Sequence, residues 1–154
     1  MLDSPQITET AAQDAAIIHL TIPRERIREV MGPGIAEVMA AAAAQGVGPA
    51  GPWFTHHLRM DPDRFDFEIG VPVNAPITPV GRVTRGTLPA AKVARTVYSG
   101  GYEGLGAAWR ELDAWIRAEG HKPNADFWER YVAGPESSSD PKDWRTELNR
   151  PIAD

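Results

Sequence analysis

One order of short elements occurs twice along this chain, and this repetition limits the folds open to it more than any other property of the sequence. Each occurrence reads as a strand, a helix and two more strands, over about 60 residues. The two stretches span about residues 15–73 and 90–152, within a single domain of residues 1–154. They predict an α+β fold in which a pseudo-twofold antiparallel sheet carries two main helices and a central groove.

The first stretch begins with a short β-branched segment, Ala15 to Ile22, which is typical of a strand. Helical spacing of apolar residues follows from Pro23, but the Gly-Pro-Gly run at 32–34 is expected to break or kink this helix before it resumes. The helix should end at Gln45-Gly46. Beyond it we expect a hairpin of strands 53–60 and 65–73 around a turn at 61–64, and then a connection over residues 74–86.

The second stretch repeats this order, with a strand over Ala91 to Tyr98 and a helix that ends at Gly120. The helix is predicted by apolar residues at steps of four, three and four: Leu105, Trp109, Leu112 and Ile116. Strands over 127–133 and 144–152 complete it. When the two stretches are aligned, Thr55 corresponds to Glu129 and His57 corresponds to Tyr131.

Composition narrows the class of protein further. Glycine and proline number 14 each, which favours many turns between short elements. The chain has no cysteine, so disulfides, thiol nucleophiles and cysteine-ligated metals are excluded. The N-terminus lacks the pattern of a secretory signal and no apolar run could span a bilayer, so we expect a cytoplasmic protein without membrane contact. The net charge of −5 argues against direct nucleic-acid binding.

Several short runs resemble one family of bacterial proteins. They are Gly-Pro-Trp-Phe at 51–54, the run from Asp66 to Val73, Gly-Gly-Tyr-Glu-Gly-Leu at 100–105, Trp-Glu-Arg-Tyr at 128–131 and Trp-Arg-Thr-Glu-Leu at 144–148. In this order the chain is similar to the GyrI-like small-molecule-binding domain, which also serves as the effector-binding module of AraC-type and multidrug-responsive regulators. The resemblance covers nearly the whole chain.

The resemblance implies a lipophilic pocket between the halves, often accepting cations, with a buried carboxylate on the strand that here carries Glu129. Some stand-alone members are thought to hydrolyse strained, cyclopropane-containing DNA-alkylating natural products. This sequence shows no helix-turn-helix or coiled-coil segment, which weakens a role on DNA. It also has His57 where many relatives have tyrosine.

The residues themselves also single out Glu129. Alternate residues of a strand share a face, so Phe127, Glu129 and Tyr131 should point one way. A carboxylate among aromatic rings suits a lipophilic cation, and burial would raise its pKa enough for it to act as a base toward water. An ordinary salt bridge to an Arg or Lys is the alternative. If the protein is a hydrolase, Glu129, Tyr131 and His57 are the expected catalytic residues; binding without turnover stays equally open.

The expected ligand-binding residues lie on both halves of the chain: Trp53, Thr55, Phe67, Tyr102, Trp109 and Phe127. Trp109 falls on the apolar stripe of its helix, so it belongs either to the core or to the pocket wall. No cofactor is expected. No metal site is expected either, because the neighbouring His56 and His57 should face opposite sides of one strand.

The expected partner is therefore a small lipophilic or cationic molecule. Two other functions stay open. The chain could dock on another protein, as a gyrase inhibitor of this family does, or it could sense an effector for a separate transcription regulator. The sequence does not determine the natural ligand or the oligomeric state.

Overall fold

The computed structural model describes residues 2–153, apart from the side chain at position 60. These residues form nine strands, two α-helices and three short 3-10 turns. The chain divides into two compact units. We call Ala11–Ala90 the first repeat, and the stretch from Ala91 onward, together with the start of the chain up to Thr10, the second repeat.

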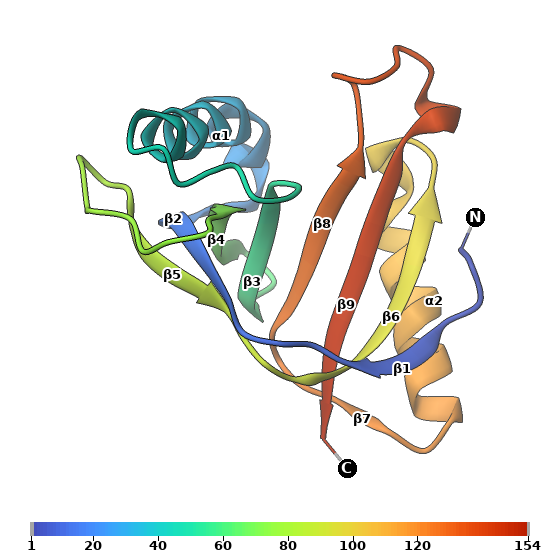
Figure 1. The fold of residues 1–154 in the computed structure, drawn as a ribbon. Helices are drawn as coiled ribbons and strands as arrows, with labels where there is room; N and C mark the ends of the chain where they lie inside the picture. The colour runs from blue at the N-terminus through green and yellow to red at the C-terminus, as the bar shows by residue number, and fades with distance from the viewer. Residues whose placement is uncertain (1, 154) are drawn as a thin grey trace. The chain divides into compact units, whose positions relative to one another are not determined.

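In the first repeat one helix covers a face of a four-stranded antiparallel sheet of order β3-β4-β2-β5 (Figure 1). Its elements are β2 (Gln13–Pro23), α1 (Ile27–Ala44), β3 (Phe54–Met60), β4 (Arg64–Pro72) and β5 (Thr84–Leu88). Ile18 and Ile69 from the sheet pack in one core with Val38 of α1, and all three are at most 1% exposed. A Cβ on Gly34 would lie 2.5 Å from Ile69 Cδ1, so this glycine lets the helix approach the sheet closely.

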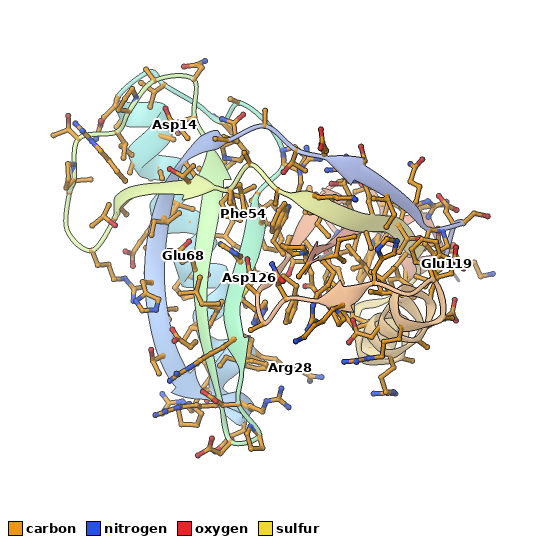
Figure 2. All side chains as sticks on the ribbon, turned by 90° about the horizontal axis from the view of Figure 1, so that it is seen from below. Asp14, Arg28, Phe54, Glu68, Glu119 and Asp126 are labelled. Carbon is orange, nitrogen blue, oxygen red and sulfur yellow. The ribbon has the colours of Figure 1, made fainter. Side chains whose placement is uncertain are left out.

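The second repeat has the same plan, with strands in the order β8-β9-β6-β1 and the short β7 paired to β9. Its elements are β1 (Gln6–Glu9), β6 (Lys92–Ser99), α2 (Leu105–Ala118), β7 (Lys122–Pro123), β8 (Phe127–Ala133) and β9 (Arg145–Ala153). Leu112 and Ile116 of α2 are fully buried against Ala94 and Leu148 of the sheet. The helix ends beside Glu119, labelled in Figure 2, because the next residue, Gly120, has a φ of 82°.

The repeats also share a detail of register. In the β3–β4 hairpin the pairing shifts between His57 and Arg59, and in the β8–β9 hairpin it shifts between Tyr131 and Ala133. A β-bulge at the matching place in both hairpins supports the alignment of His57 with Tyr131. The predicted α+β class, with antiparallel strands and two main helices, is confirmed. The central groove stays a prediction.

The predicted break in the first helix is wrong. Helix α1 runs without interruption from Ile27 to Ala44 with Pro33 inside it. Pro33 removes one backbone hydrogen bond, but the same turn places Gly34 and Val38 in the core. Burial of this face against β2 and β4 outweighs the local preference to stop.

Some strands were not predicted. The connection expected over residues 74–86 contains the start of β5, which pairs with β2. The strand β1 and the two-residue β7 were also missed, and Trp53 lies just before β3 rather than within it. Short edge strands of this kind carry little apolar alternation of their own and are stabilised by the strand they pair with.

Candidate ligand-binding site

Glu129 lies in the middle of β8 with its carboxylate buried, and the residue is 8% exposed. Each carboxylate oxygen accepts one hydrogen bond. The Tyr131 hydroxyl donates to Oε1 at 2.5 Å, and the indole N–H of Trp109 on α2 donates to Oε2 at 2.6 Å. Because residues 129 and 131 share one face of the strand, the tyrosine and its acceptor meet as the alternation predicts.

Both hydrogen-bond partners of Glu129 are neutral. The salt bridge to an Arg or Lys that the sequence left open is therefore not the arrangement found at this carboxylate. Burial raises the pKa of the Glu129 carboxyl, while the hydrogen bonds from Tyr131 and Trp109 act in the opposite direction. The site thus holds a buried carboxyl group with a raised pKa and two uncharged hydrogen-bond donors.

Aromatic rings surround this carboxylate within the second repeat. Trp109 lies against Phe127, with 4.5 Å between ring centroids, and the Arg150 guanidinium carbon lies 5.2 Å from the Phe127 centroid. Phe127 is 5% exposed, so its ring is largely occupied by these two neighbours. Trp109 is half-buried and packs against the core while its N–H donates to Glu129. Its role as a pocket wall stays a prediction.

A second group of rings adjoins Tyr131. The half-buried Tyr102, in the 3-10 turn before α2, meets Tyr131 edge to face at 6.0 Å and lies against Trp144 at 5.0 Å. The Trp144 indole N–H donates to the Ser138 carbonyl at 2.9 Å, which fixes this ring at the edge of the loop before β9. Rings that remain half-buried next to a buried carboxylate can contact a lipophilic cation.

The first repeat places different chemistry at the corresponding positions. Thr55, 1% exposed, stands where Glu129 stands in the second repeat. His57 stacks on Phe67 at 5.2 Å and meets Phe65 edge to face at 5.3 Å. Phe67 is fully buried in the core beneath α1.

In the first repeat the charged side chain of Arg24 lies over an aromatic ring. The guanidinium carbon of Arg24 lies 4.7 Å from the centroid of Phe65, in the turn and ring positions that Tyr102 and Trp144 occupy in the second repeat. Burial, and then the nearby charges of His56 and Arg24, lower the pKa of His57 to about 4. His57 is therefore a neutral ring at neutral pH.

Comparison with known proteins now decides the family. A family model of the GyrI-like small molecule binding domain matches residues 3–153. The chain belongs to this family. The resemblance predicted from the short sequence runs is thereby confirmed over nearly the whole GyrI-like domain. Among the curated proteins there is no significant match.

Solved structures share the fold of this GyrI-like domain at low sequence identity. The EcmrR C-terminal domain has a TM-score of 0.83 at 20% identity, with 97% of each chain covered. SAV2435 bound to tetraphenylphosphonium has a TM-score of 0.73 at 14% identity, covering 98% of this chain and 94% of that one. A hydrolase from Listeria innocua has a TM-score of 0.62 at 11% identity, covering 97% and 91%. At these identities the likeness concerns the fold alone.

The structure brings together only part of the predicted site. Tyr131, Trp109, Phe127 and Tyr102 gather with Glu129 in the second repeat. The remaining predicted residues, His57, Trp53, Thr55 and Phe67, belong to the first repeat, and their contact with a ligand stays a prediction. Sequence reasoning missed Trp144, whose ring lies 5.0 Å from that of Tyr102.

A metal site and a membrane-spanning helix are absent from the described part of the chain. Among residues 2–153 no group of three His, Asp or Glu side chains is arranged to hold a metal ion. His56 lies 3.6 Å from Glu68 and His57 stacks on Phe67, so the neighbouring histidines face opposite sides as predicted. No α-helix in the described part of the chain has the length and hydropathy needed to cross a membrane. A surface hollow of about 270 Å³ beside β2 and β5 is lined by Asp14, Ala15, Pro76, Arg85, Gly86 and Thr87, which lie in the first repeat, outside the Glu129 cluster.

Proposed function

We propose that this domain binds lipophilic cations at the Glu129 cluster of the second repeat. The observation that carries the proposal is a buried carboxylate whose two hydrogen-bond partners, Tyr131 and Trp109, are both neutral. Its negative charge is therefore not offset by a positive side chain, and a bound cation would supply the missing charge. Half-buried rings next to it can each add about 0.5–2 kcal/mol of cation–π attraction.

The family and its fold support this proposal. The chain is a GyrI-like small-molecule-binding domain, and SAV2435, which has the same fold, is bound to a lipophilic cation. The carboxylate and rings of the Glu129 cluster offer that class of ligand both charge and apolar surface. Whether the ligand then reacts is a separate question.

Binding can be tested with tetraphenylphosphonium, followed by the fluorescence of the tryptophans beside Glu129. We expect Glu129→Gln to weaken the affinity by about tenfold or more, because the substitution removes the charge while it keeps the shape. The Gln side chain can keep both hydrogen bonds, since the Tyr131 hydroxyl can donate or accept.

A matched control is offered by Glu147, which lies on the other face of the same sheet. Its carboxylate is already paired with Arg130 at 2.9 Å, so Glu147→Gln should leave the affinity unchanged. Triphenylphosphine oxide, a neutral aromatic probe, should bind wild type and Glu129→Gln alike. Equal affinity of tetraphenylphosphonium for wild type and Glu129→Gln would contradict the proposal.

Hydrolysis of an electrophilic ligand is a second candidate function, favoured by the raised pKa of Glu129. A carboxylate with a raised pKa can take a proton from water while the water oxygen bonds to a carbon of the cyclopropane. The ring C–C bond to that carbon breaks, its electron pair passes to the enolate of the conjugated carbonyl, and the enolate carbon takes up the proton from Glu129. Tyr131 would hold the carboxylate in place. We expect wild type to convert a cyclopropane conjugated to a carbonyl into its water adduct. Mass spectrometry should show that Glu129→Gln binds the probe without converting it; conversion by both proteins at one rate would exclude this role.

A further inference from the structure

Two hydroxyl groups near Glu129 are buried without a hydrogen-bond partner among residues 2–153. They are Tyr102 Oη and Thr146 Oγ1. Thr146 is completely buried, and Tyr102 is half-buried with its hydroxyl at the buried end. Buried polar groups in native proteins are nearly always hydrogen-bonded, so each of these two exceptions calls for an explanation.

Tyr131 connects both hydroxyl groups to the site. Thr146 is paired with Tyr131 across β8 and β9, and the Tyr102 ring meets the Tyr131 ring at 6.0 Å. The Tyr131 hydroxyl itself donates to Glu129. The two unpartnered hydroxyls therefore belong to residues that flank the tyrosine bonded to the carboxylate.

Tyr102 has no hydrogen-bond partner in the nearest loop, although the carboxylate of the exposed Glu136 lies close to the same point. Its hydroxyl reaches Gly134, where an added Cβ would lie 2.7 Å from it. The Gly134 carbonyl already accepts from the Ser137 and Ser138 amides at 3.0 and 3.2 Å and from the Ser137 hydroxyl at 2.9 Å. Burial, followed by the charges of Glu136 and Glu129, raises the pKa of Tyr102, so its hydroxyl keeps the proton and remains a donor.

The first repeat shows that this polar pair is not required by the fold. In the positions that correspond to Tyr102 and Thr146 it has Arg24, which lies over Phe65, and the fully buried Phe67. The same framework is thus built there without hydroxyl groups. The shared framework therefore does not by itself account for the two hydroxyl groups of the second repeat.

We infer that Tyr102 and Thr146 bind an alcohol group carried by the same ligand whose positive charge lies beside Glu129. This inference rests on the proposed function and narrows the ligand class to lipophilic cations that also bear a hydroxyl group. An alcohol suits either residue, because it can both donate and accept a hydrogen bond. An all-hydrocarbon cation such as tetraphenylphosphonium would leave both hydroxyls unpartnered.

Matched phosphonium ions separate this inference from the proposed function. Butyltriphenylphosphonium and (3-hydroxypropyl)triphenylphosphonium differ only by a terminal methyl or hydroxyl group, and propyl and 2-hydroxyethyl analogues give the next shorter pair. The dissociation constants of each pair would be measured by calorimetry with wild type, Tyr102→Phe and Thr146→Val. Both substitutions keep the shape of the side chain and remove one unpartnered hydroxyl.

We expect the preference for alcohol over alkyl, expressed as the ratio of the two dissociation constants, to fall about tenfold in at least one of these variants at one chain length. Tyr98→Phe is the control, because the Tyr98 hydroxyl is buried but already donates to the Gly101 carbonyl at 2.8 Å. Its ratio should match that of wild type.

The outcomes are distinguishable. If the alkyl ions bind but the ratio is the same in wild type, Tyr102→Phe and Thr146→Val, this inference is overturned while the proposed function stands. If no phosphonium ion binds to wild type, the proposed function fails and this inference fails with it. Near-ultraviolet circular dichroism would verify that each variant is folded before its ratio is interpreted.

Discussion

Acidification from pH 6.5 to about pH 4 is expected to remove about 3 kcal/mol from the free energy of unfolding through His57 alone. The pKa of this ring falls from 6.5 to about 4 on folding, chiefly because it is buried. Below pH 6.5 His57 binds a proton in the unfolded chain but stays neutral in the folded chain, so folding becomes less favourable as the pH falls. Once the pH is below about 4, the folded state is protonated as well and the loss is complete.

Urea unfolding of wild type and His57→Phe at a series of pH values would measure this effect. Phenylalanine can keep the stack on Phe67 and has no proton to bind. The remaining histidines are present in both proteins, so their contributions cancel in the comparison. Above pH 6.5 we expect the free energies of unfolding of the two proteins to change with pH in parallel. Below pH 6.5 the wild-type value should fall more steeply than that of His57→Phe. Parallel curves over the whole range would show that His57 is not buried as a neutral ring.

The second large effect concerns the stability cost of Glu129. We expect Glu129→Gln to raise the free energy of unfolding at neutral pH by about 1–3 kcal/mol, because it removes a buried charge that has only neutral partners. The folded-state pKa of Glu129 is raised above its ordinary 4.5. The cost is therefore absent below about pH 4.5 and grows as the pH rises through the folded-state pKa.

Thermal or urea unfolding at acidic and neutral pH would show whether Glu129→Gln becomes more stable than wild type only as the pH rises. Glu147 provides a control of opposite sign. Burial acts to raise the pKa of Glu147, but hydrogen bonds from Asn149 and Arg130 outweigh it, and the net shift is downward. Glu147→Gln should thus destabilise the protein at neutral pH. A Glu129→Gln variant that is less stable than wild type at neutral pH would refute the proposed cost.

Much of the fold could be predicted from the sequence where local pattern and tertiary packing agree. The apolar steps from Leu105 to Ile116 predict α2 because the same side chains form the buried face of that helix. Pro33 predicts the end of a helix that in fact continues, because packing against the sheet overrides local propensity. The strand β5 has no apolar alternation, so only its pairing with β2 reveals it.

For the candidate site, the contact within one strand could be predicted from the sequence, but the contacts between different elements could not. Alternation along β8 places Tyr131 on the same face as Glu129, and the structure confirms their contact. The contact of Trp109 with Glu129 joins a helix to a strand, and no local pattern encodes which helix turn lies over which strand residue. For the same reason the stack of Tyr102 on Trp144 could not be predicted: it depends on the loop before β9.

The guanidinium of Arg24 over Phe65 bears on how many guest molecules one chain can hold. The two repeats share one plan, yet the first repeat already holds a positive side chain of its own at this position. The first repeat also has Thr55 where the second has Glu129, so it has no negative charge at that position to attract a second cation. We therefore expect the proposed binding of a lipophilic cation to saturate at one molecule per chain.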